Sequence, residues 1–190
     1  MRRFVDRGAI YAGWVGVGMA VTIAVSFLLV IPIEPVVWLL ALPAGLLIGY
    51  YANARSNRQA GPWRRIIANG AFAGFLTAAT LAILFLVTKS VFFSADNGYR
   101  SAADGGPIAG CETGAGCVYA RYLEAGKGPE LEAAGITNVD EFTAFYWREQ
   151  LGTAGTVFVL AFLGGLGGAM IYGIARPKAV QPAPGSPGER

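Results

Sequence analysis

Four long runs of apolar residues constrain this chain more than any other feature of its sequence. They cover residues 8–33, 34–54, 66–88 and 151–175. A helix needs about 20 apolar residues to cross the hydrocarbon layer of a bilayer, and only the second run is near the lower limit. Charged residues make up 14% of the chain, against roughly 25% in soluble domains. We therefore expect an all-α integral membrane protein with four transmembrane helices arranged as two hairpins.

The first run follows a short basic segment, which is also the pattern of a secretory signal peptide. Its apolar stretch, residues 8–33, is much longer than the roughly 7–15 residues of a signal-peptide core, and no small-x-small cleavage site follows it. We interpret this run as a retained transmembrane helix.

Basic residues are distributed unevenly between the segments that connect the four runs. Segments 1–7, 55–65 and 176–190 hold ten of the fifteen Lys and Arg residues and two of the twelve acids, whereas 89–150 holds five basic and nine acidic residues. Because cytoplasmic segments carry an excess of Lys and Arg, we expect both termini and the 55–65 loop to be cytoplasmic. The remaining loop, of about 60 residues, is long for a passive connection. We expect this loop to be extracytoplasmic and the membrane to be the plasma membrane. The Pro/Gly-rich tail is expected to be disordered.

The tryptophans give a second indication of the membrane boundaries. Trp14, Trp38, Trp63 and Trp147 each lie at a predicted end of a membrane-spanning run. Trp is enriched at both membrane–water interfaces, so this placement agrees with the four predicted helices.

The two cysteines, Cys111 and Cys117, lie in the predicted extracytoplasmic loop. The intervening segment contains two glycines, which allow a tight turn, and an oxidising compartment favours disulfides. We expect a structural disulfide. Free thiols, or a redox or metal site, remain alternatives, although the chain has no histidine to complete a metal site.

The same loop contains three helical patterns. Residues 117–127 and 128–135 are short helical patches, and Asn138 followed by Glu141 resembles a capping box. The last helix is therefore predicted to begin near Val139 and to continue into the membrane.

Three aromatic residues of this extension, Phe142, Phe145 and Tyr146, share one side of the predicted helix by their spacing. The neighbouring acids Asp140, Glu141 and Glu149 could suggest a catalytic or calcium site. A solvated helix face is the simpler interpretation, since no calcium-binding loop motif is present.

Small residues recur every fourth position in all four runs and predict close helix packing. The predicted packing residues are Gly8, Ala12, Gly16, Gly45, Gly49, Gly70, Gly74, Gly164, Gly165 and Gly168. The fourth run carries two small faces, one with Gly164 and Gly168 and one with Gly165 and Ala169. We expect one of these faces to bind a partner chain or a second copy, and the alternative is that all the faces pack internally.

The chemistry of the chain limits its function. The chain lacks histidine, and no ionisable residue lies in the core of any apolar run. Because coupled transporters usually need an ionisable residue there, its absence argues against such a transporter. We expect no catalytic residue, metal, cofactor or nucleic acid, and the bilayer as the main partner. The expected function is a non-enzymatic accessory or structural subunit of a larger membrane complex. The alternative is a transport component, either a channel-like oligomer or the partner of a transporter.

Overall fold

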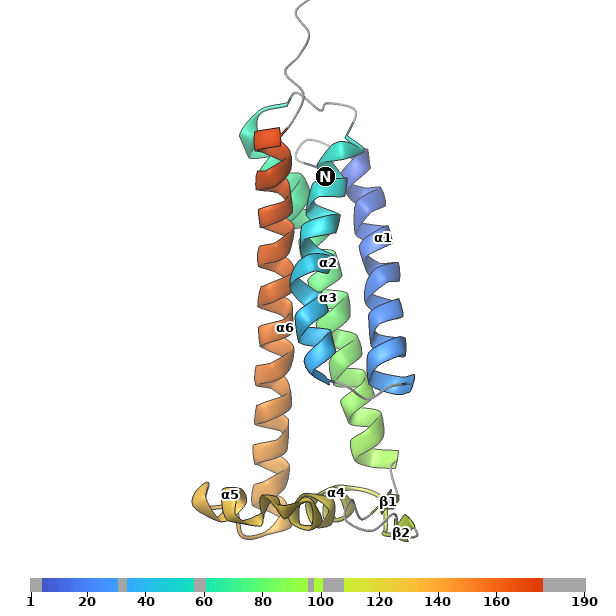
Figure 1. Ribbon diagram of the computed structural model, residues 1–190, viewed down its shortest axis with the longest axis vertical. Coiled ribbons are helices and arrows are strands. Elements are labelled where there is room, and N and C mark those ends of the chain that lie inside the picture. Colours follow the sequence, from blue (N-terminus) through green and yellow to red (C-terminus); the bar gives the residue numbers. More distant parts are fainter. Residues whose placement is uncertain (1–4, 31–33, 57–60, 96–97, 101–107, 176–190) are drawn as a thin grey trace, which may run out of the picture. The chain divides into compact units, whose positions relative to one another are not determined.

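The computed structural model of the chain describes residues 5–30, 34–56, 61–95, 98–100 and 108–175. Within this part the chain is mostly helical, with one short two-stranded hairpin and short turn or coil segments such as 111–114 and 134–138. As the sequence predicts, four helices are long and apolar enough to cross a membrane (Figure 1). They are α1 (Arg7–Ala24), which continues as the π-helical turn η1 (Val25–Val30), α2 (Glu34–Ala54), α3 (Trp63–Ala95) and α6 (Val139–Ala175). The predicted tail 176–190 lies outside the described residues.

Proline marks the start of two of these helices. Pro35 is the second residue of α2, and Pro62 directly precedes α3. A proline is tolerated in the first turn because its missing N–H would have no partner there. The N–H groups of Arg65 and Ile66 donate to the Pro62 carbonyl at 2.9 and 3.3 Å. A third proline, Pro43, lies inside α2, which continues through it.

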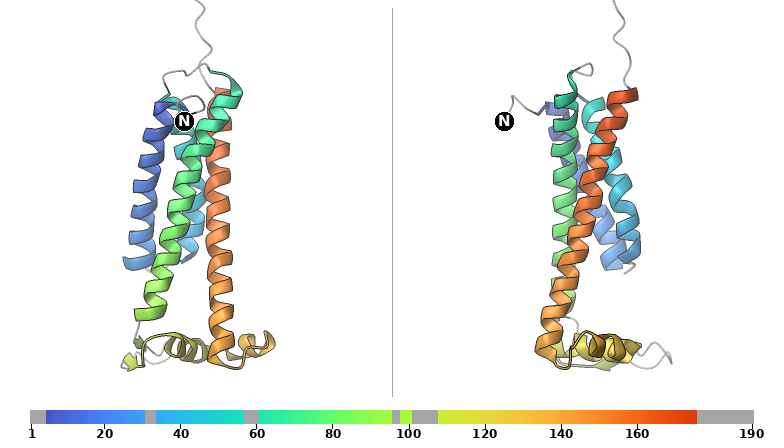
Figure 2. Two further views of the ribbon diagram at one scale, coloured as in Figure 1. Left: turned by 180° about the vertical axis from the view of Figure 1, so that it is seen from behind. Right: turned by 90° about the vertical axis from the view of Figure 1, so that its left-hand side faces the viewer.

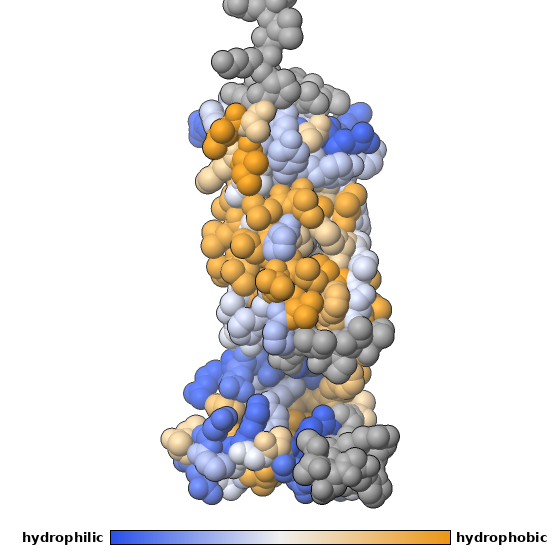
Figure 3. Space-filling view, viewed as in Figure 1, coloured by the Kyte–Doolittle hydropathy of each residue, from blue (hydrophilic) through white to orange (hydrophobic). Residues whose placement is uncertain are grey.

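The chain divides into two compact units that each combine distant segments. Unit one comprises Met1–Met19, Ala41–Ala78 and Leu160–Arg190, and unit two comprises Ala20–Leu40 and Ala79–Val159. Each of the four long helices therefore has one part in unit one and the other part in unit two. Figure 3 shows hydrophobic side chains gathered over the long helices and hydrophilic ones over the connection between α3 and α6.

Glycines set the helix contacts of unit one, where α2, α3 and α6 lie side by side (Figures 1 and 2). A Cβ atom added to Gly164 or Gly168 would meet the backbone of α2, and one added to Gly165 would lie 2.6 Å from the Cα of Gly74 in α3. From α2, Gly45 and Gly49 face the α6 backbone in the same way. Both small faces of α6 are therefore in use, one against α2 and one against α3.

This arrangement corrects one sequence-based prediction. We expected one small face of α6 to remain free for a partner, and that prediction is wrong for the described residues. The two faces are about 100° apart on the helix, and α6 lies between two helices of its own chain. On the α3 side, Gly70 is closed by Ala169 and Gly165.

The small face of α1 also packs internally. Ala12 is fully buried, and a Cβ atom on Gly8 would lie 2.5 Å from the Arg55 carbonyl oxygen. A Cβ atom on Gly16 would collide with Thr77 of α3, whose hydroxyl donates to the Ala73 carbonyl at 2.9 Å. Close packing of this kind suits helices in lipid, because lipid tails are as apolar as leucine and give no hydrophobic drive for helices to associate.

Unit two contains the hairpin and three short helical segments. Strands β1 (Gly98–Arg100) and β2 (Ile108–Gly110) pair antiparallel, with Tyr99 opposite Ala109. They are followed by α4 (Ala115–Tyr122), the turn η2 (Leu123–Lys127) and α5 (Gly128–Ala133). Helices α4 and α5 lie across the axis of the first turns of α6 (Figures 1 and 2). The two predicted helical patches of the loop correspond to this α4–η2–α5 segment.

Candidate interaction module

The start of α6 has a defined capping structure. Asn138 Oδ1 accepts a hydrogen bond from the Glu141 N–H at 2.9 Å, which satisfies one of the free donors of the first turn. The Glu141 carboxylate accepts in return from the N–H of Thr137 at 2.8 Å and from its hydroxyl at 3.1 Å. The reciprocal bond of the predicted box therefore reaches one residue further back than in the usual motif, and α6 begins at Val139 as predicted.

A second motif joins α5 to α6 at Gly135, whose φ of 75° suits glycine. The N–H of Ile136 donates to the Leu131 carbonyl and that of Gly135 to the Glu132 carbonyl, both at 2.9 Å. This pair of bonds is the Schellman pattern, which closes a helix and turns the chain. The side chains of Leu131 and Ile136 are both buried in the same cluster, as the motif requires.

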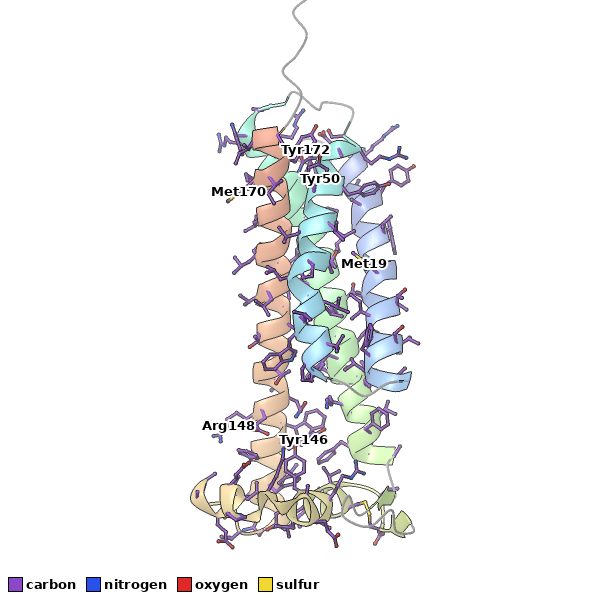
Figure 4. The ribbon with its side chains drawn as sticks, in the orientation of Figure 1. Met19, Tyr50, Tyr146, Arg148, Met170 and Tyr172 are labelled. Carbon is purple, nitrogen blue, oxygen red and sulfur yellow. A yellow bond between two sulfur atoms is a disulfide. The ribbon has the colours of Figure 1, made fainter. Side chains whose placement is uncertain are left out.

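Residues 115–150 and Phe93 of α3 enclose a cluster of large rings, which we call the aromatic module. Its apolar members are Phe93, Val118, Tyr119, Tyr122, Leu131, Ile136, Phe142, Phe145, Tyr146 and Trp147. Phe142 is fully buried, and its ring centroid lies 5.1 Å from Tyr119 and 5.0 Å from Tyr122. The Phe93 ring lies 4.8 Å from the Tyr146 ring (Tyr146 is labelled in Figure 4). Such tilted and edge-on ring contacts add about 0.5–1.5 kcal/mol per pair to the burial of the rings.

Charge is arranged around this cluster in two ways. Lys127 Nζ lies 4.8 Å from the centroid of the Tyr122 ring, and the Arg148 guanidinium lies 5.8 Å from that of Phe145, both within reach of a cation–π interaction. Segment 110–150 also holds seven acids against three basic residues, and all seven acids are exposed: Glu112, Glu124, Glu130, Glu132, Asp140, Glu141 and Glu149. The module thus presents an acidic surface over an apolar interior.

Two polar side chains lie close to the interior of the module. Burial raises the pKa of the Tyr122 hydroxyl, Glu149 raises it further, and Arg121 offsets part of the rise. Gln150 is 7% exposed, and its Oε1 has no hydrogen-bond partner among the described residues. The described residues contain no group of three or more His, Cys, Asp or Glu side chains that could hold a metal ion.

The cysteine pair lies at the start of the module. The Cα atoms of Cys111 and Cys117 are 5.4 Å apart, within the usual range for a disulfide, and their sulfur atoms lie at bonding distance. Cys117 is buried in the first turn of α4, and Gly114 adopts a φ of 112° just before it. The glycine in the spacer therefore supplies the turn that the sequence predicts.

A separate polar cluster joins three helices in unit one, and we call it the polar clasp. The Asp6 carboxylate accepts from the Ser56 hydroxyl at 2.6 Å and from the Asn69 amide at 3.3 Å. The Asn69 amide also donates to Asn53 Oδ1 at 3.3 Å. Arg65 lies 4.0 Å from Asp6, and both asparagines are 1% exposed. Every link joins residues far apart in the sequence, and the clasp was not among the predicted sites.

Sequence reasoning also missed part of the aromatic module. The spacing of Phe142, Phe145 and Tyr146 indicated one shared side, but Tyr119 and Tyr122 were not assigned to it. Their own three-residue spacing on a predicted helix was the available signal.

Compared with protein-family models, with curated proteins and with solved structures, the chain matches none. The case for a function therefore depends on the module and the helices themselves.

Proposed function

We propose that this chain is a non-enzymatic multi-pass membrane protein that serves as an accessory or structural subunit of a larger membrane complex. In this proposal both termini are cytoplasmic, residues 89–150 are extracytoplasmic, and the membrane is the plasma membrane. The aromatic module is the part that meets the partner. The main support is that the glycine faces of α1, α2, α3 and α6 in unit one pack against other parts of the same chain. The folded, acidic module then offers the surface best suited to a polar partner.

The acidic surface favours a partner with a basic patch. All seven acids of segment 110–150 are exposed, whereas Lys127 and Arg148 lie over aromatic rings. Complementary charge accelerates association and fixes orientation more than it adds raw affinity. We therefore expect binding to weaken as salt increases.

Copurification in mild detergent tests this proposal. The wild-type chain should carry a stoichiometric partner, and Glu130→Lys with Glu132→Lys should release it without unfolding the chain, because both side chains are exposed on α5. The matched control is Leu163→Ala, which changes an exposed side chain on α6 and should retain the partner. A chain that runs alone would contradict the proposal. A homo-oligomer with a water-filled axis would favour the transport alternative.

The orientation can be tested independently with an impermeant thiol reagent on intact cells. Ser56 is a poor position for a reporter cysteine because it is 4% exposed and donates to Asp6. Arg64→Cys and Glu130→Cys replace exposed side chains. We expect labelling at position 130 and protection at position 64, with the wild-type chain as the background control. The opposite pattern would reverse the proposed topology.

A further inference from the structure

Three exposed arginines from different segments gather at one end of unit one. They are Arg7 at the start of α1, Arg55 directly after α2, and Arg64 in the first turn of α3. The backbone holds them together: a Cβ atom on Gly8 would lie 2.5 Å from the Arg55 carbonyl oxygen. On the other side, Asp6 next to Arg7 pairs with Arg65 next to Arg64, at 4.0 Å. The three exposed arginines therefore lie at the same end of unit one, and we call this group the arginine patch.

Among the described residues of unit one, acids do not balance the charge of this patch. Asp6 is the one acidic residue in the described part of unit one, and its carboxylate is already engaged by Ser56, Asn69 and Arg65. The polar clasp thus fixes the three helix ends while leaving the net positive charge of the patch at the surface. Several arginines at one surface are well suited to phosphate, which Arg binds with paired hydrogen bonds.

An exposed strip of α1 leads away from the patch. Arg7, Tyr11, Trp14 and Gly18 follow one another at steps of four, three and four residues, so they share one face of the helix. Tyr11 and Trp14 are each 69% exposed, and a Cβ atom on Gly18 would meet nothing within 4 Å. Tyr and Trp favour the headgroup level of a membrane. The strip therefore begins with a charge, continues with interfacial rings and ends in open apolar surface.

We propose that the arginine patch binds the phosphate of an anionic phospholipid, whose acyl chain lies along Tyr11, Trp14 and Gly18. The patch supplies the charge complementarity and the strip supplies the apolar contact, so the ligand is a lipid with a negatively charged headgroup. Each arginine near a membrane surface contributes about fivefold in affinity for anionic lipid. This inference does not depend on the accessory-subunit role or on the topology proposed above.

The test uses the full chain in nanodiscs of phosphatidylcholine alone or mixed with phosphatidylglycerol. Native mass spectrometry of the released protein then compares retained phosphatidylglycerol with retained phosphatidylcholine. The wild type should retain phosphatidylglycerol preferentially, and Arg7→Gln, Arg55→Gln and Arg64→Gln should each reduce the preference about fivefold. The matched control is Arg148→Gln, which removes an exposed arginine from the aromatic module and should keep the full preference.

Three outcomes would overturn the proposal. A chain that carries Arg7→Gln, Arg55→Gln and Arg64→Gln together could keep the preference, or the Arg148→Gln control could lose it equally, which would indicate a general charge effect. Inorganic phosphate could also stabilise the detergent-solubilised wild type against heating as much as phosphatidylglycerol does, which would identify a free-phosphate site. Circular dichroism checks that each variant remains helical. Arg→Lys at the same three positions keeps the charge but loses the paired hydrogen bonds, so it should retain more of the preference than Arg→Gln and less than the wild type.

Discussion

Unit one and the aromatic module solve the packing problem with residues of opposite size. In unit one, Gly45 and Gly49 of α2 face the α6 backbone, and Gly165 faces Gly74 of α3. In the module, whole rings fill the interior, with Phe142 buried between Tyr119 and Tyr122. The first region relies on the absence of side-chain atoms and the second on their presence.

The difference follows from the surroundings that the two regions are built for. Between helices in lipid, burial of apolar surface gives little drive, so association depends on close backbone contact. The module has an exposed acidic surface, and in water the removal of large rings from solvent is the dominant stabilising term. Adding volume should therefore damage unit one, and removing volume should damage the module.

The largest effect is expected for Gly165→Leu. A Cβ atom alone would lie 2.6 Å from the Gly74 Cα, and a backbone cannot move aside as a flexible side chain can. Overpacking a well-filled interior typically costs about 1–3 kcal/mol, and this position should exceed that range. We expect loss of the folded bundle, measured by helical content and tryptophan fluorescence during titration with a denaturing detergent.

The matched control for that experiment is Gly155→Leu in the same helix. A Cβ atom at Gly155 would meet nothing within 4 Å, so the added side chain should be accommodated with little loss of stability. If the two leucine variants unfold alike, a general effect of leucine in α6, rather than contact with the α3 backbone, explains the result, since leucine is itself a better helix former than glycine. The comparison between the two regions would then fail.

The module should respond most strongly to Phe142→Ala. Removal of a fully buried phenylalanine typically costs about 3–5 kcal/mol, because the lost burial is accompanied by a cavity. We expect faster proteolysis within the α4–α5 segment, while the bundle of unit one stays folded. Val139→Ala is the control, since Val139 is 36% exposed. Unchanged proteolysis in Phe142→Ala would show that the rings are not what holds the module together.

A smaller effect is expected from removing the cysteine pair. If Cys111 and Cys117 form the predicted disulfide, closing their short loop stabilises the module by about 2 kcal/mol on the chain-entropy model. Replacing both by serine should lower the unfolding midpoint of the module but leave the helices inserted in the membrane. Intact-mass analysis after alkylation without reductant provides the direct check. Modification of both thiols in the wild type would exclude the bond.

Much of the local structure could be predicted from sequence, because it depends on neighbours in the chain. The four apolar helices and the start of α6 after Asn138 follow from composition, periodicity and capping chemistry. The choice of partners could not be predicted in the same way. Four-residue spacing showed that Gly164 and Gly165 lie on different faces, but not that α2 and α3 occupy them.

The same limit applies to the polar clasp, whose Asp6 and Asn69 are 63 residues apart. Nothing in the local pattern around either residue specifies the other, because a half-buried carboxylate can be satisfied by many combinations of donors. Sequence patterns therefore predicted elements and faces, whereas the contacts between faces required the structure.

The smallest effect concerns the junction at which the module joins α6. Asn138 Oδ1 accepts from the Glu141 N–H at 2.9 Å, and replacing such a cap by alanine typically costs about 1 kcal/mol. We expect Asn138→Ala to increase amide hydrogen exchange in the first turn of α6 and to leave the rest of the helix protected. Asn138→Asp keeps the acceptor and adds a charge that the helix dipole favours, so it should exchange as slowly as the wild type. Equal exchange in the alanine and wild-type chains would mean that the buried rings, rather than the cap, fix the start of α6.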